Sequence, residues 1–254
     1  GVAHVRLNRP DKLNALDYET FVGLTDAGKR LMDDPSLRAV VLSGEGRAFC
    51  AGLDVSAMFA LGQQGGGGLF EQEPHSPANR AQRACWIWRE LPVPVIAAVH
   101  GYAFGGGLQI ALGADMRYLA PGTQLSVMEI KWGLIPDMSG TQTLRDLVRL
   151  DIAKELVFTG RLVEAEEALR IGLATAIHDD PLAQAMAQAR GIAERSPSAI
   201  RAGKQLMNAS VRLSVAEGLA LEAEIQKALI GSPNQLEAVR ANIAKEPPNF
   251  VDPE

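Results

Sequence analysis

Apolar and polar positions follow two different patterns in the first half of the chain. Residues 2–7 alternate and predict a half-buried strand, whereas other segments are wholly apolar and predict strands covered on both faces. The expected strands span residues 2–7, 39–42, 92–99 and 115–119. Helices are expected over residues 17–32, with Asp17 as the cap, over residues 79–90, and from Gly107 onward. This alternation predicts an α/β core.

The second half of the chain has mostly helical periodicity. From about Met138 onward the expected helices span residues 140–148, 151–158, 163–171, 182–195, 198–210 and 214–230. Pro197 and Pro233 interrupt this region. We predict a core over residues 1–195 and a C-terminal helical region over residues 196–254, which together form one functional unit. Such a region can cover the core or pack on another subunit.

Composition narrows the class of protein. The 254 residues include 47% hydrophobic and 22% charged side chains, which is typical of a globular domain. A net charge of −5 makes a nucleic-acid partner unexpected, because such proteins usually carry a basic stripe. Only two cysteines occur, and no apolar run approaches the roughly 20 residues that span a bilayer. We therefore expect a cytoplasmic protein without a membrane span.

Glycines mark two segments that could present backbone N–H groups to a ligand. Gly105-Gly106-Gly107 begins a predicted helix, whose first N–H groups have no partner within the helix. The spacing matches neither a dinucleotide-binding nor a phosphate-binding loop, so on its own it is also compatible with a simple tight turn. A second Gly-rich turn precedes Leu53. One N–H group from each segment could bracket a carbonyl oxygen, which is the minimal oxyanion hole.

Four ordered motifs resemble the crotonase, or enoyl-CoA hydratase/isomerase, superfamily. They are the segments at residues 7–16, 41–54, 94–107 and 129–142, and residues 247–250 also resemble the C-terminal end of that family. The resemblance implies an α/β spiral of ββα units with a C-terminal helical trimerisation region. It also implies acyl-CoA thioester substrates and a homotrimer or a dimer of trimers. Neither a metal nor a redox cofactor is implied, since coenzyme A is part of the substrate.

The same resemblance assigns the candidate catalytic residues. Leu53 and Gly106 match the two N–H donors of the oxyanion hole. Hydratases of the family use two glutamates; Glu129 matches one, but Gln109 stands where the other is expected. An amide cannot exchange protons at neutral pH, so this difference favours an isomerase, in which one base moves one proton. Asp137 is a second candidate carboxylate, or else a cap of the following helix.

Further residues are expected to bind substrate by the same resemblance. They are Lys12, Leu13, Ala15, Ala51, Asp54, Val55, Phe104, Gly105, Met128 and Trp132. Lys12 and Arg47 could contact the phosphates of coenzyme A, although solvated side chains are the simpler interpretation. Residues 58–70 are expected to set the pocket depth, and the Gly-rich residues 62–68 are interpreted as a loop or a lid.

The favoured function is an enoyl-CoA isomerase that stabilises a thioester enolate. The alternatives are an enoyl-CoA hydratase with altered acid/base residues and a non-catalytic acyl-CoA-binding protein. Dehalogenases and thioesterases share the fold, so the family alone does not fix the reaction. We expect Trp132 and Ile135 to desolvate Glu129 and thereby raise its pKa. His100 and Cys50 are interpreted as structural residues rather than as a base or nucleophile.

Overall fold

A five-stranded parallel sheet forms the centre of the computed structural model, which describes residues 1–62 and 68–253. Its strand order is β1-β2-β3-β5-β8, and a smaller sheet has the order β4-β6-β7. The strands are β1 (Val2–Leu7), β2 (Ala39–Gly44), β3 (Val95–Val99), β4 (Tyr102–Phe104), β5 (Met116–Leu119), β6 (Gln124–Ser126), β7 (Val163–Glu164) and β8 (Ala176–Ile177). The prediction of an α/β core is confirmed.

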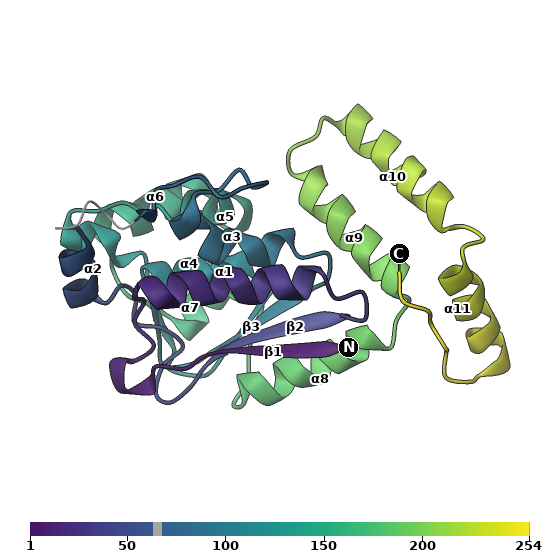
Figure 1. Ribbon diagram of the computed structural model, residues 1–254, viewed down its shortest axis with the longest axis horizontal. Helices are drawn as coiled ribbons and strands as arrows, with labels where there is room; N and C mark the ends of the chain where they lie inside the picture. Colours follow the sequence, from purple (N-terminus) through teal and green to yellow (C-terminus); the bar gives the residue numbers. More distant parts are fainter. Residues whose placement is uncertain (63–67, 254) are drawn as a thin grey trace.

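Helices connect and cover these strands, as Figure 1 shows. The α-helices are α1 (Tyr18–Met32), α2 (Val55–Gly62), α3 (Arg80–Glu90), α4 (Gly106–Gly113), α5 (Gly140–Leu147), α6 (Leu150–Thr159), α7 (Ala165–Ile171), α8 (Pro181–Ala193), α9 (Pro197–Ser210), α10 (Val215–Leu229) and α11 (Pro233–Ala244). Short 3₁₀ helices are η1 (Pro10–Lys12) and η3 (Met128–Trp132).

Both faces of the main sheet are covered, which explains the continuous apolar runs over residues 39–42 of β2 and 95–99 of β3. Val40 and Leu42 belong to the larger hydrophobic core, together with buried residues of α1, α3 and α4. Ala39 and Val41, which alternate with them, pack in a second cluster with Ala185 of α8 on the opposite face. A continuous apolar run is thus the expected signature of these strands.

The observed elements differ from the predicted ones in three places. A helix was expected over residues 163–171, but the first two of these residues form strand β7. Helix α2 (Val55–Gly62) was not predicted, and it overlaps the start of residues 58–70. Of the predicted Gly-rich loop, residues 63–67 lie outside the described part of the chain. Helix α11 was not predicted, although a proline at its start is compatible with a helix because the first N–H groups need no helical acceptor.

Helices α9, α10 and α11 lie to one side of the sheet domain (Figure 1). Lys204 of α9 holds this region against the core, since its Nζ donates to the carbonyl oxygens of Trp88 and Val93 at 3.0 and 2.9 Å. The same ammonium lies 2.8 Å from the Asp115 carboxylate. Within residues 1–62 and 68–253, no helix is both long and apolar enough to cross a membrane.

Candidate active site

A cavity of about 360 Å³ opens between the segment around the start of α2, the end of β4 with the start of α4, and η3 with the residues that follow it. Ten of the residues predicted from the sequence line it: Ala51, Leu53, Val55, Phe104, Gly105, Gly106, Met128, Glu129, Trp132 and Asp137. Gly52, Phe59, Leu134 and Met138 also line it. Gly52 belongs to the predicted Gly-rich turn and Phe59 to residues 58–70, which were expected to set the pocket depth, whereas Leu134 and Met138 were not predicted. The size suits a small organic group, and most of the lining is apolar.

The two glycine-rich segments lie side by side in the structure. The Cys50 N–H donates to the Tyr102 carbonyl at 3.0 Å, and the Phe104 N–H donates to the Cys50 carbonyl at 3.0 Å. This ladder brings Leu53 and Gly106 to the same cavity. Segments that are about 50 residues apart in sequence therefore supply neighbouring backbone groups, as the oxyanion-hole hypothesis requires.

The N–H groups of Leu53 and Gly106 are both available to a ligand. Leu16 pairs with the flanking residues instead: its N–H donates to the Gly52 carbonyl, and its carbonyl accepts from the Asp54 N–H. Gly106 is the first residue of α4, where N–H groups have no helical acceptor. In the described residues, neither N–H group donates to a backbone carbonyl.

Close packing of this ladder depends on glycine at two positions. Gly52 has φ +94°, and a Cβ atom there would lie 2.9 Å from the Phe104 carbonyl oxygen. A Cβ atom on Gly107 would lie only 2.4 Å from the Cys50 carbonyl oxygen. Any larger residue would separate the two segments and thus the two N–H donors.

Glu129 is the buried carboxylate of the cavity. It lies in η3 and is 7% exposed. Its Oε1 atom accepts a hydrogen bond of 2.6 Å from Gln109 Nε2. Its Oε2 atom is buried and has no partner among the described residues. The two oxygens are therefore inequivalent, and Oε2 is the one that remains available for a proton.

The Gln109 amide has a fixed orientation. Its Oε1 atom accepts hydrogen bonds from the backbone N–H groups of Met138 and Gly140, at 2.9 and 2.8 Å. A flipped amide would point its NH₂ group at these two donors and its oxygen at the Glu129 carboxylate. Gln109 is thus held as a hydrogen-bond donor to Glu129 and does not line the cavity itself.

Burial raises the pKa of Glu129 above its ordinary value. The hydrogen bond from Gln109 acts in the opposite direction, and the charge of Asp137 adds to the increase. The sequence analysis predicted this increase in the pKa of Glu129, but it attributed the desolvation partly to the wrong residue. Trp132 lines the cavity, whereas Ile135 is 70% exposed and lines a neighbouring cavity.

Asp137 is the second carboxylate at this cavity. Although the residue is exposed by surface area, desolvation of its carboxylate raises its pKa. The alternative role as a helix cap is wrong, because Ser139 occupies the N-cap position of α5 and the Gly140 N–H at the start of that helix donates to Gln109. Asp137 therefore stays available for chemistry or for selecting substrates.

Four predicted binding residues do not line the cavity. Lys12 is exposed at the end of η1, and the carbonyl oxygens of Leu13 and Ala15 accept hydrogen bonds from the Ala51 N–H and from Arg9. Asp54 lies 3.3 Å from the Arg9 guanidinium and accepts a hydrogen bond from the Ala57 N–H at the start of α2. These contacts support the surrounding loops rather than the cavity wall.

Two side chains considered for chemistry have structural surroundings. The Cys50 thiol donates to the Asn14 carbonyl at 3.0 Å, and burial raises its pKa to about 12. A thiol with such a pKa is a poor nucleophile at neutral pH. His100 lies 2.9 Å from the Gly46 carbonyl and outside the lining of the cavity.

Sequence reasoning missed the residues that hold Gln109 against Glu129. Met138 and Gly140 act through their backbone N–H groups, which a side-chain motif does not reveal. A Cβ atom on Gly140 would lie 2.6 Å from Gln109 Oε1, so the small residue is required there. Across residues 1–62 and 68–253, no group of three or more His, Cys, Asp and Glu side chains could hold a metal ion.

Comparisons with known proteins agree with this arrangement. A family model described as Enoyl-CoA hydratase/isomerase matches residues 1–253. The chain is 33% identical to the short-chain-enoyl-CoA hydratase of Clostridium acetobutylicum, over 96% of this chain and 92% of that protein. It is 30% identical to the peroxisomal Delta(3,5)-Delta(2,4)-dienoyl-CoA isomerase of Arabidopsis thaliana, over 98% and 92%.

A solved structure shows the same relation. The enoyl-CoA hydratase of Mycobacterium tuberculosis H37Rv aligns with a TM-score of 0.87 and 30% identity, covering 98% of this chain and 95% of that one. The crotonase-like fold predicted from the sequence motifs is thereby confirmed.

Burial of the Glu129 carboxylate predicts a measurable effect on stability. A raised pKa means that the folded state binds this proton more tightly than the unfolded state, so stability falls as pH rises from the unfolded to the folded pKa. Glu129→Gln removes that penalty. We expect its melting temperature to exceed that of the wild type by roughly 2–4 °C at pH 8.

The difference should shrink at pH 4, where the wild-type carboxyl is protonated. Glu166→Gln, at an exposed position of α7, is the matched control and should show no such dependence on pH. A Glu129→Gln variant that is less stable than the wild type at pH 8 would contradict the assignment of a buried, desolvated carboxylate.

Proposed function

The chain belongs to the enoyl-CoA hydratase/isomerase family, and on that premise we propose that it is an enoyl-CoA isomerase, which moves a double bond along an acyl-CoA thioester. The Gln109–Glu129 pair is the observation that carries this proposal. An isomerase needs one proton carrier, and here the second position of the expected glutamate pair is occupied by an amide that is fixed as a donor.

The proposed reaction is a 1,3 proton shift. Glu129 Oε2 removes a proton from C2 of a 3-enoyl thioester, and the electron pair of the C2–H bond delocalises onto C4 and the thioester oxygen. The N–H groups of Leu53 and Gly106 stabilise the negative charge on that oxygen. Glu129 then returns the proton to C4, which forms the C4–H bond, leaves the double bond between C2 and C3, and restores the carbonyl.

The oxyanion hole supplies a large part of the rate enhancement in this scheme. The α-proton of a thioester is only weakly acidic, so its removal depends on stabilising the enolate. Losing one donor of such a site typically costs about 2.7–4 kcal/mol of transition-state stabilisation. The ladder between the Cys50 and Phe104 segments holds both donors in place before substrate binds.

Glu129→Gln is the direct test of this function. We expect kcat for conversion of 3-hexenoyl-CoA to 2-hexenoyl-CoA to fall by at least about 100-fold, because the amide cannot carry a proton. Exchange of solvent deuterium into C2 should fall in parallel, while the Kd for saturated hexanoyl-CoA stays close to that of the wild type. Full turnover in the variant would overturn the role of Glu129. Binding without any exchange in the wild type would favour the non-catalytic alternative.

A hydratase is the second candidate, and Asp137 is the observation that favours it. Asp137 lines the same cavity as Glu129 and its pKa is also raised, so it could supply the second carboxylate that hydration needs. The name of the Clostridium relative points the same way. Hydration of crotonyl-CoA by the wild-type protein, and its loss in Asp137→Asn, would support this alternative.

Gln109→Glu tests whether the amide restricts the reaction. Its carboxylate would face Glu129 Oε1 at the present separation of 2.6 Å, so the two groups would share a proton and resemble the glutamate pair of hydratases. We expect hydration of crotonyl-CoA to rise at least tenfold while isomerisation falls. Gln226→Glu, at an exposed position of α10, is the matched control. Unchanged hydration would show that residue 109 does not decide between the two reactions.

We further propose that the protein is a homotrimer or a dimer of trimers, assembled through the helical region α9–α11. Val215, Leu219 and Ile243 are 81%, 59% and 79% exposed on helices that lie beside the core (Figure 1). An isolated chain would leave this apolar surface in water. A second copy of the same chain covers it in the assembly that the family resemblance implies.

Sedimentation velocity measures this assembly directly. We expect the wild-type protein to sediment with a mass that is three or six times that of the chain. Leu219→Glu should shift the distribution toward monomer, because a charge would be buried in the interface. Glu222→Gln, an exposed neighbour on α10, should not. A wild-type monomer at micromolar concentration would contradict the proposal.

A further inference from the structure

Leu16 connects the two segments that carry the N–H groups proposed for the oxyanion hole. Its N–H donates to the Gly52 carbonyl at 2.8 Å, and its carbonyl accepts from the Asp54 N–H at 2.9 Å, so its backbone pairs around Leu53. Its fully buried side chain reaches the other segment, since a Cβ atom on Gly106 would lie 2.8 Å from Leu16 Cδ1. The position of Leu16 therefore affects both N–H groups.

Arg9 holds the two residues that flank Leu16. Its Nη1 atom donates to the Ala15 carbonyl, and its Nη2 atom lies 3.0 Å from a carboxylate oxygen of Asp17. The same Nη2 atom donates to Asp54, in the facing segment, at 3.3 Å. Because the guanidinium is a planar and rigid group, these three contacts fix the two segments relative to one another.

Each of the two carboxylates uses its other oxygen at the start of a helix. Asp17 Oδ1 accepts from the Thr20 N–H at 2.9 Å in the first turn of α1. Asp54 Oδ1 accepts from the Ala57 N–H at 3.2 Å in the first turn of α2. N–H groups in a first turn lack helical acceptors, so these contacts also restrain the carboxylates that Arg9 binds.

The two carboxylates depend on the cation between them. Both lie within 3.3 Å of the same nitrogen atom, and the side chains of Asp17 and Asp54 are only 16% and 12% exposed. Two carboxylates in such a place repel each other, because little water screens their charges. Without Arg9 this repulsion would act directly across the pairing that Leu16 makes with the Leu53 segment.

Arg9 acts at a distance from the substrate in this arrangement. It lies outside the described lining of the active-site cavity. Both of its terminal nitrogens already bind protein oxygens, so a ligand phosphate would have to displace a carboxylate or the Ala15 carbonyl. An effect of Arg9 on the reaction would therefore pass through the position of Leu16.

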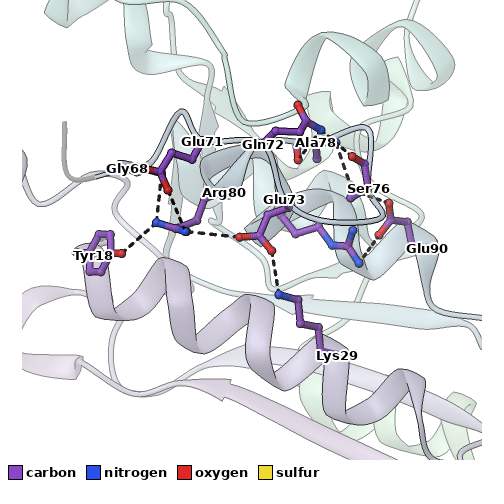
Figure 2. Close-up of polar contacts among 11 residues, drawn as sticks. Tyr18, Lys29, Gly68, Glu71, Gln72, Glu73, Ser76, Ala78, Arg80 and Glu90 are labelled. Carbon is purple, nitrogen blue, oxygen red and sulfur yellow. Dashed lines mark hydrogen bonds and ion pairs between the residues drawn. The ribbon is translucent and has the colours of Figure 1, made fainter. Parts of the chain in front are cut away.

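Arg80 makes a comparable set of contacts at the next residue of α1, as Figure 2 shows. Its guanidinium donates to the Tyr18 hydroxyl and the Gly68 carbonyl, both at 3.2 Å, and to Glu73 at 3.4 Å. The Arg80 side chain is 26% exposed, and that of Arg9 is 31% exposed. The contacts of Arg80 lie outside the described lining of the active-site cavity, which makes this arginine a matched comparison.

We propose that Arg9 is a positioning residue of the oxyanion hole: it holds Leu16 in place and thereby keeps both N–H donors directed at one thioester oxygen. The inference rests on the proposed function, because it takes the oxyanion hole as the site of the enolate charge. It goes beyond that function by assigning a role to a side chain outside the cavity. Misplacing a reacting group by about 1 Å can lower a rate about 100-fold, so a small shift of Leu16 is sufficient for a large effect.

The carbonyl of a bound thioester reports the state of the oxyanion hole without turnover. Hydrogen bonds to its oxygen lower the carbonyl stretching frequency, which infrared difference spectra measure for hexanoyl-CoA with a heavy isotope at the carbonyl carbon. We expect the wild-type protein to lower this frequency relative to the ligand in water, and Arg9→Gln to lose most of that shift.

Turnover provides the second readout. We expect kcat for isomerisation of 3-hexenoyl-CoA to fall by about 10- to 100-fold in Arg9→Gln, while the Kd for hexanoyl-CoA changes by less than about threefold. The effect on kcat is larger because the negative charge on the thioester oxygen develops during the reaction.

Two further variants separate positioning from stability. Arg80→Gln removes a comparable set of contacts, so it should lower the melting temperature about as much as Arg9→Gln but keep the wild-type carbonyl frequency and kcat. Arg9→Lys keeps a cation between the carboxylates without the rigid fork. We expect its frequency and kcat to lie between those of Arg9→Gln and the wild type, and it replaces Arg9→Gln if that variant does not fold.

Three results would overturn the inference. A wild-type carbonyl frequency in Arg9→Gln, or in Arg9→Lys where only that variant folds, would show that Arg9 does not position the donors. An equal loss of the shift in Arg80→Gln would show a general effect of lower stability. A large increase in the Kd with an unchanged frequency would identify Arg9 as a contact of the ligand itself.

The infrared measurement also distinguishes this inference from the proposed isomerase. A wild-type frequency shift that depends on Arg9, in a protein that does not isomerise 3-hexenoyl-CoA, would support the role of Arg9 and contradict the isomerase. A wild-type protein that produces no shift would contradict the oxyanion hole and, with it, the role of Arg9.

Discussion

The Gln109 side chain joins three parts of the active site that are distant in sequence. Its oxygen accepts hydrogen bonds from two backbone N–H groups in the segment that enters α5. Its NH₂ group donates a hydrogen bond to one carboxylate oxygen of Glu129. Gln109 itself belongs to α4, the helix whose first residue, Gly106, provides one of the two N–H groups proposed for the oxyanion hole. One amide therefore connects the proposed base, the helix of the proposed oxyanion site and the segment that enters α5.

In this arrangement Glu129 provides the titratable group, and Gln109 fixes its position. The Glu129 carboxylate is kept basic by burial, while the amide restrains it without offering a competing proton. A glutamate at position 109 would add a second titrating group in the same place. Gln109→Glu would thus change the number of titratable groups at the site, while the fold can stay the same.

The sequence predicted the core well because local patterns and burial agree there. The apolar runs of β2 and β3 reflect packing on both faces of the sheet, and Asp17 caps α1 through a hydrogen bond of 2.9 Å to the Thr20 N–H. Helix α11 was missed because Pro233 was interpreted only as a break. Strands β7 and β8 each have two residues, which is too few for the sequence to show a periodicity.

The sequence pointed to candidate site residues where side chains or glycines carry the motif, and it did not reveal those that act through backbone or tertiary contacts. Leu53, Gly106 and Glu129 line one cavity as expected. The contacts that fix Gln109 come from main-chain N–H groups of Met138 and Gly140, which any residue type could provide. The desolvation of Glu129 likewise depends on neighbours in the folded chain, and Ile135, which was expected to contribute to it, lines a neighbouring cavity instead.

The environment of Cys50 has a practical consequence for solution studies. Its thiol and that of Cys85 are both buried, and these are the only cysteines in the chain. Alkylating reagents require an accessible thiolate, and burial disfavours that form at both positions. The two native cysteines should therefore react little with a thiol-reactive fluorophore, which can be attached selectively at an introduced surface cysteine. Slow labelling of the unmodified protein, in turn, reports how often the core around α4 opens.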